Sequence, residues 1–142
     1  MERILIDTDV TLDFLSKRNG FYESANQLFS LLDLRKIEGF STPVMFSNLH
    51  YILSGISGKT VVIDLLKKLR SKIKIISVFE THIDSALNSG FPDFEDAIQY
   101  FSALDQSIDF IITRNKKDFG KSSIPVMTAE EFIHYFKSIS RN

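Results

Sequence analysis

Five short apolar runs alternate along the chain with longer segments whose apolar residues recur every three or four positions. Short apolar runs predict buried strands, whereas the wider spacing predicts amphipathic helices. The expected strands are residues 4–6, 39–41, 73–78, 110–112 and 125–127. Strands that alternate with helices favour right-handed crossovers and a parallel sheet covered on both faces. The sequence therefore predicts an α/β fold, a three-layer sandwich with a central, mostly parallel five-stranded sheet.

Several helix starts are indicated by residues that cap the first backbone N–H groups. Thr42, followed by a proline, predicts one start, and Thr128 opens a sequence similar to a capping box. Asp93 has two interpretations, as a capping residue and as a functional carboxylate. Asp9 is interpreted as the N-cap of a helix that begins at Thr11.

Composition limits the class of protein. A chain of 142 residues with 44% hydrophobic content fits a single domain, residues 1–142, with a full core. Its 17 basic and 18 acidic residues give a net charge of -1, so only a local basic patch could hold a polyanion. The chain has no cysteine, signal peptide or transmembrane run, and we expect a soluble, cytoplasmic protein.

Acidic residues gather at predicted strand ends and at one helix start. Asp7 directly follows the first apolar run, and Asp118 follows the run at 110–112. In an open α/β sheet, ligands bind outside the carboxyl ends of the strands. Asp93 and Asp96 are three residues apart and share one helix edge, whereas Glu95 is expected elsewhere. These acids are the candidates for metal or phosphate chemistry.

The run Asp7-Thr8-Asp9-Val10-Thr11 also matches the DxDx[TV] signature of haloacid dehalogenase-like phosphatases. In that family the first aspartate is the nucleophile and the second a general acid. The order of the other motifs argues against this alternative, because the acidic helix here precedes the strand that ends at Thr113.

A different family has these motifs in the observed order. The first strand with Asp7, then FPDFEDAIQY at 91–100, then FIITRNKKDF at 110–119, resembles PIN-domain proteins, including the VapC-like toxins of bacterial toxin-antitoxin pairs. The resemblance covers essentially the whole chain. It implies an acidic pocket that binds Mg²⁺ or Mn²⁺ and cleaves single-stranded RNA, a homodimer, and, for a toxin, an antitoxin partner.

The resemblance also assigns roles to individual residues. The implied catalytic set is Asp7, Asp93, Asp96, Asn115 and Asp118, of which Asp7, Asp96 and Asp118 are the implied metal ligands. Asn115 falls at the last acidic position of the family, and Asp118 is close enough to substitute for it.

One position departs from the family. Asn48 stands where these proteins usually have a glutamate, and an amide can give a metal an oxygen but no charge. Two functions therefore remain open, an active endoribonuclease and a weakened domain that binds RNA or a protein without cleavage. Arg114, Lys116 and Lys117 are predicted to contact the RNA backbone, with a solvated charged loop as the alternative.

Overall fold

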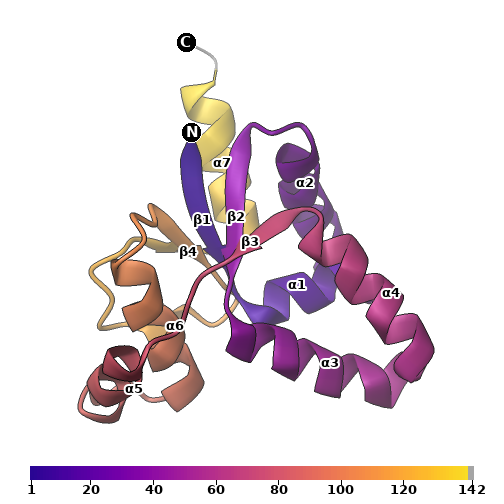
Figure 1. The fold of residues 1–142 in the computed structure, drawn as a ribbon. Helices are drawn as coiled ribbons and strands as arrows, with labels where there is room; N and C mark the ends of the chain where they lie inside the picture. The colour runs from indigo at the N-terminus through magenta and orange to yellow at the C-terminus, as the bar shows by residue number, and fades with distance from the viewer. Residues whose placement is uncertain (141–142) are drawn as a thin grey trace.

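The computed structural model describes residues 1–140. One five-stranded sheet has the order β3-β2-β1-β4-β5, and all four pairings are parallel (Figure 1). The strands are β1 (Glu2–Ile6), β2 (Ile37–Ser41), β3 (Ile73–Ile75), β4 (Phe110–Ile112) and β5 (Val126–Met127). The predicted α/β fold with a parallel five-stranded sheet is confirmed.

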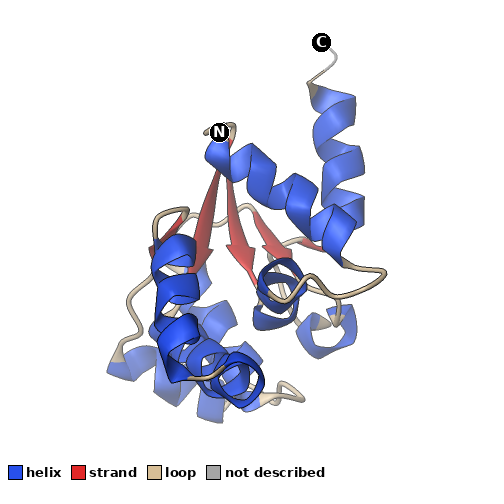
Figure 2. Cartoon of the chain, turned by 90° about the vertical axis from the view of Figure 1, so that its right-hand side faces the viewer, coloured by secondary structure: helices blue, strands red, loops and turns tan. Residues whose placement is uncertain are grey.

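Helices flank both sides of this sheet (Figure 2). They are α1 (Thr8–Leu15), α2 (Tyr22–Asp33), α3 (Pro43–Ser57), α4 (Lys59–Arg70), α5 (Glu80–Leu87), α6 (Phe94–Leu104) and α7 (Ala129–Ile139), with a short 3-10 helix at Lys116–Phe119. Helices α3 and α4 form a hairpin that extends beyond the sheet (Figure 1). Within residues 1–140, none of the helices has the length and apolar character needed to span a lipid bilayer.

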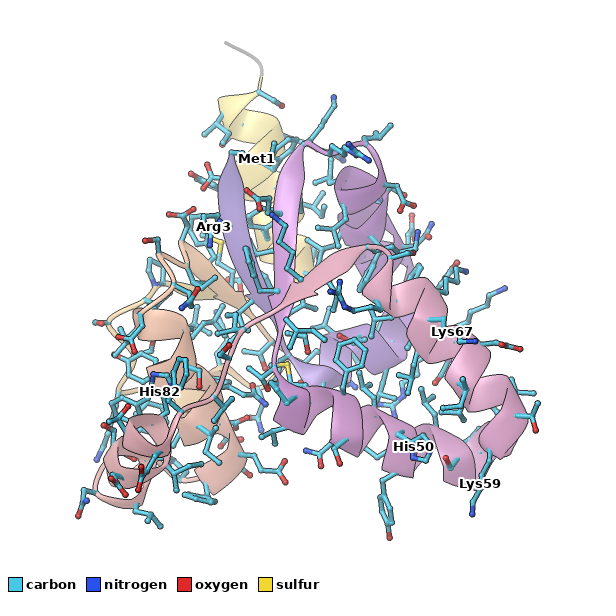
Figure 3. The ribbon with its side chains drawn as sticks, in the orientation of Figure 1. Met1, Arg3, His50, Lys59, Lys67 and His82 are labelled. Atoms are coloured by element: carbon cyan, nitrogen blue, oxygen red, sulfur yellow. The ribbon has the colours of Figure 1, made fainter. Side chains whose placement is uncertain are left out.

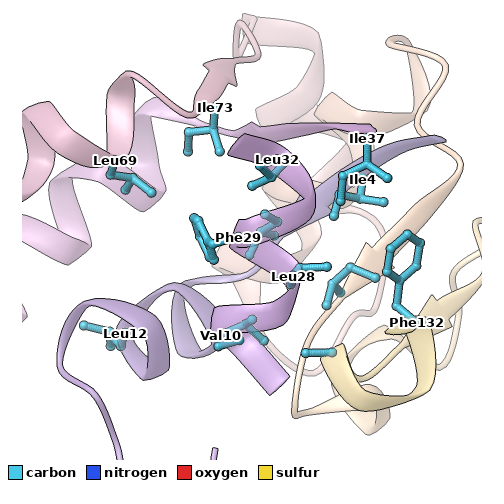
Figure 4. Close-up of a cluster of buried hydrophobic side chains, with 14 of the residues drawn as sticks. Ile4, Val10, Leu12, Leu28, Phe29, Leu32, Ile37, Leu69, Ile73 and Phe132 are labelled. Atoms are coloured by element: carbon cyan, nitrogen blue, oxygen red, sulfur yellow. The ribbon is translucent and has the colours of Figure 1, made fainter. Parts of the chain in front are cut away.

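Successive residues of β1 pack into different cores. Ile4 and Ile6 belong to a cluster with Phe29 and other side chains of α1, α2 and α7 (Figure 4). Leu5 points to the other face and packs with Tyr100 of α6. Because side chains alternate along a strand, the central strand is covered by a helical layer on each face. This arrangement gives the three layers that the sequence predicts.

The strand predicted at 73–78 is shorter than expected. It ends at Ile75, and the last contact with β2 is the bond from the Ile76 amide to the Ser41 carbonyl, at 2.8 Å. β2 ends at Ser41, and the chain turns directly into α3 at Pro43. The residues after Ile76 therefore have no strand to pair with.

The predicted role of Asp9 as an N-cap is wrong. Helix α1 begins at Thr8, and its N-cap is Asp7, whose Oδ1 accepts the Thr8 amide at 2.8 Å. β1 runs into α1 without a loop, so the helix starts three residues before the predicted Thr11. The N-caps predicted at Thr42, Asp93 and Thr128 are confirmed.

The chain order places a crevice at the ends of β1 and β4. β2 and β3 extend the sheet on one side of β1, and β4 then pairs with its other side, with Ile6 opposite Ile112. Such a switch in direction opens a crevice outside the carboxyl ends of the two strands. The residues that follow Ile6 and Ile112 therefore face each other across it.

Candidate functional site

A pocket of about 290 Å³ lies at this switch point, and we call it the acidic pocket. It is lined by Asp7, Thr8, Asp9, Leu12, Asn48, Ile52, Asp93, Glu95, Asp96, Gln99, Asn115 and Asp118. Six of these residues are acidic, and none is Lys, Arg or His. Basic side chains such as Lys59 and Lys67 project from α4 on the outside of the molecule (Figure 3). The pocket therefore concentrates negative charge in a nearly neutral protein.

Asp7 is held at the centre of this arrangement. Its Oδ1 caps α1, and its Oδ2 accepts the Thr113 hydroxyl at 2.7 Å. Burial and the charge of Asp9 raise the pKa of Asp7 to about 6, although the bonds from Thr113 and Thr8 act in the opposite direction. The side chain therefore has a fixed orientation and gives up its proton reluctantly.

Asp9 also lines the acidic pocket, although the sequence favoured a capping role for it. Its Oδ2 accepts the Arg114 amide at 3.1 Å, and burial raises its pKa. Thr113 is fully buried between the two strand ends and also accepts the Asn115 amide at 3.0 Å. The hydroxyl of Thr113 thus couples Asp7 to the loop that follows β4. The missed signal was the immediate passage from β1 into a helix.

Helix α6 brings carboxylates that are distant from Asp7 in the sequence into the acidic pocket. Asp93 caps the helix, and its Oδ1 accepts the Asp96 amide at 3.0 Å. Burial, followed by the charges of Asp7, Asp93 and Asp118, raises the pKa of Asp96 to about 8. Asn115 donates to Asp118 Oδ2 at 2.5 Å on the facing loop. All five residues of the predicted catalytic set therefore line the same pocket.

Glu95 lies in the pocket as well, and its expected location elsewhere is wrong. From the first turn of α6 its Oε2 accepts the side-chain amide of Asn48 on α3 at 2.6 Å. The position of a residue around the helix does not fix where its carboxylate lies, because a glutamate side chain is long enough to reach a neighbouring helix. The Asn48 side chain, at the position where the resemblance implies a glutamate, thus donates a hydrogen bond to a glutamate of α6.

The predicted RNA-contacting cations differ in their surroundings. Nε of Arg114 contacts Asp13 Oδ2 at 3.0 Å, and the Asp13 carboxylate is buried. Nζ of Lys116 pairs with Glu131 at 3.0 Å. Lys117 is exposed on the 3-10 helix. Arg114 and Lys116 are therefore engaged by carboxylates of the protein itself.

The donor atoms of the acidic pocket fit a hard divalent cation. Among residues 1–140, no three histidine or carboxylate groups are already gathered into a metal cage. Oxygens of Thr8, Asp9 and Gln99 are nevertheless buried at the pocket without a hydrogen-bond partner. Mg²⁺ and Mn²⁺ prefer oxygen donors and retain several waters, so a partial set of protein ligands suits them.

Comparisons with known proteins give two matches over most of the chain. Residues 3–117 match the family model described as PIN domain. Ribonuclease VapC1 of Aquifex aeolicus (strain VF5) is 24% identical over 143 residues, which cover 97% of this chain and 98% of that protein.

Solved structures show the same fold. FitAcB from Neisseria gonorrhoeae has a TM-score of 0.67 at 15% identity and covers 89% of this chain and 98% of its own. VapBC-1 from nontypeable Haemophilus influenzae has a TM-score of 0.66 at 15% identity, with coverages of 90% and 98%. A toxin-antitoxin complex from Klebsiella pneumoniae gives 0.63 at 22% identity, with coverages of 89% and 97%. Because the family model covers most of the chain, the phosphatase alternative suggested by Asp7 and Asp9 is wrong, and the chain belongs to the PIN-domain family.

Proposed function

We propose that the chain is a metal-dependent endoribonuclease that cleaves single-stranded RNA in the cytoplasm as the toxin of a toxin-antitoxin pair. The observation that carries the proposal is the convergence of six carboxylates, from β1–α1, α6 and the loop after β4, in one pocket. The whole-length relative named Ribonuclease VapC1 supports the reaction class.

Asp7 and Asp96 would hold the proposed cation, Mg²⁺ or Mn²⁺, with Asp118 as a further ligand. When bound, such an ion lowers the pKa of a water and stabilises charge on the attacked phosphate. Thr113 orients Asp7 for this role, and Asp93 and Asn115 would contact waters around the ion. Burial and the charges of Asp7, Asp93 and Asp118 raise the pKa of Asp96 to about 8, so protons would compete with a cation for this carboxylate.

Glu95 supports the active enzyme over the weakened binding domain. The family position occupied by Asn48 lacks a charge, yet the amide of Asn48 holds the Glu95 carboxylate at 2.6 Å in the same pocket. We infer that Glu95 restores the negative charge from the neighbouring helix. Asn48 then acts as a positioning residue rather than as a lost ligand.

Cleavage of single-stranded RNA tests the proposal. The purified protein should cut RNA with Mn²⁺ or Mg²⁺, and both EDTA and Asp7→Asn should abolish cutting. Asp64→Asn is the control, because Asp64 is an exposed acid of α4 away from the pocket. Cleavage that survives EDTA would exclude the metal mechanism, whereas RNA binding without cleavage would favour the weakened domain.

The proposed partners are an antitoxin and a second copy of the chain. Structural neighbours include complexes described as VapBC2 from Rickettsia felis and VapBC from Salmonella typhimurium, each bound to DNA. Co-expression with the product of the neighbouring short reading frame should yield a stable complex that inhibits RNA cleavage. Sedimentation of the chain alone should give the mass of a homodimer.

A further inference from the structure

A second hollow of about 370 Å³ lies beside the acidic pocket, and we call it the Phe21 pocket. Its apolar and charged walls include Val10, Asp13, Phe21, Arg114, Ala129 and Glu130. The volume falls within the range of about 300–1,000 Å³ that is usual for small-molecule sites. Neither the fold nor the acidic pocket requires such a hollow.

The two pockets share their dividing wall. Thr8 and Asp9 line the acidic pocket, whereas Val10, on the same helix α1, lines the Phe21 pocket. The loop after β4 divides in the same way, because Asn115 lines the first pocket and Arg114 the second. Helix α1 and the loop after β4 therefore each contribute neighbouring residues to the two pockets.

Arg114 is fixed in this pocket by three contacts. Its backbone amide donates to Asp9, and its Nε contacts the buried carboxylate of Asp13 at 3.0 Å. Its guanidinium carbon lies 4.0 Å from the centroid of the Phe21 ring. The Arg114 side chain is nevertheless 31% exposed. The guanidinium is therefore oriented in advance and can still donate to a ligand.

The chemistry of the walls favours a base over a phosphate. Unstacked RNA bases are recognised by stacking on aromatic rings and guanidinium planes and by hydrogen bonds at their edges. Phe21 is 46% exposed, Arg114 offers donors, and Glu130 offers an acceptor. A phosphate here would meet the negative charges of Asp13 and Glu130.

We propose that the Phe21 pocket binds one unpaired base of the RNA, next to the phosphate that is cut. The inference rests on the proposed ribonuclease function and adds a subsite to it. Arg114 is thereby assigned to a base rather than to the RNA backbone. Occupation of this subsite would select the cleavage site by the identity or accessibility of a single neighbouring nucleotide.

RNA binding in EDTA tests the pocket without cleavage. The probe is a short fluorescein-labelled single-stranded RNA containing all four bases, together with a series in which each position in turn is abasic. For the wild type, one abasic position should raise the Kd by about 5- to 150-fold, the range of single stacking contacts. Phe21→Ala should raise the Kd of the intact RNA by a similar factor. In this variant, the same abasic position should no longer change the Kd.

Matched variants separate stacking from folding. Phe21→Tyr should bind as the wild type, and Phe21→Leu should lose affinity while its Tm stays near the wild-type value. Phe79→Ala is the control, because Phe79 is also an exposed phenylalanine but lies outside both pockets. If Phe21→Ala does not fold, the leucine variant decides the result.

The outcomes distinguish this inference from the function on which it rests. Unchanged affinity in Phe21→Leu, or an abasic penalty equal in variant and wild type, would overturn the base pocket and leave the ribonuclease intact. A wild-type protein that neither binds nor cuts RNA would remove both proposals.

Discussion

Asp96 and Asp7 are single residues whose ionisation opposes folding. Burial and neighbouring carboxylates raise the pKa of Asp96 to about 8 and that of Asp7 to about 6. An unfolded aspartate has a pKa of about 3.9, so the folded state binds these protons more tightly. Their stabilising effect is fully present below about pH 4 and is lost as the pH rises through about 6 and about 8. A bound cation would offset this loss.

Replacement of Asp96 by asparagine tests this pH dependence. In EDTA, Asp96→Asn should raise the free energy of unfolding, because it removes a charge that the folded state disfavours. The gain should be more than about twice as large at pH 8 as at pH 5, since over this range an unfolded aspartate is ionised while folded Asp96 still binds its proton. Urea unfolding of both proteins at each pH measures it. A gain that is equal at the two pH values would contradict the assignment.

The contact between Asn48 and Glu95 predicts how each residue affects the metal. Glu95→Gln should weaken Mn²⁺ binding in calorimetry, because it removes a negative charge from the acidic pocket. Asn48→Ala should weaken it by about 10- to 100-fold, as expected for a group that orients a ligand. Glu80→Gln is the matched control, since Glu80 is also an exposed first-turn glutamate, on α5. Equal affinities in all four proteins would exclude Glu95 from the site.

At the level of elements, sequence patterns were reliable where the cause is local. Thr42 and Thr128 were identified as N-caps, and capping was one of two interpretations of Asp93, because a cap depends on residues within one helical turn. The start of α1 was misplaced because it depends on where β1 stops pairing with β4. Glu95 was misplaced because its partner, Asn48, lies on another helix. The spacing of residues within a single helix or strand does not predict the contacts between two such elements.

Gly39 in β2 tests how closely the elements pack. A Cβ at Gly39 would lie 2.9 Å from Leu32 Cδ2 and 3.0 Å from Ile73 Cγ2. Both neighbours are buried, so Gly39→Ala should lower the free energy of unfolding by about 1–3 kcal/mol. Gly55→Ala is the control on α3, where a Cβ has no neighbour within 4 Å and should stabilise the helix by about 0.5–1 kcal/mol. Chemical denaturation of both variants measures the two changes in the free energy of unfolding. A Gly39→Ala variant that is more stable than the wild type would contradict the close packing around Gly39.

At the scale of the whole molecule, the alternation of apolar runs was enough to predict the parallel sheet and its covering layers. The resemblance to PIN-domain proteins also predicted that Asp7, Asp96 and Asp118 converge in one pocket. The sequence did not indicate the Phe21 pocket, since Asp13 and Arg114 are far apart in the chain and meet only through the β1–β4 pairing. The topology of the site was predictable, whereas the contacts that orient its side chains required the fold.

Cation binding should stabilise the entire domain, because the ligands come from segments that converge only in the folded state. At Mn²⁺ concentrations of about 100 times the Kd, linkage gives about 2.7 kcal/mol, or a rise in Tm of about 5–11 °C for a domain of this size class. The rise should be larger at pH 8 than at pH 6, since protons compete for Asp7 and Asp96. Thermal unfolding with and without Mn²⁺ measures it, with Asp64→Asn expected to respond as the wild type and Asp7→Asn expected not to respond. A shift retained in Asp7→Asn would place the cation outside the acidic pocket.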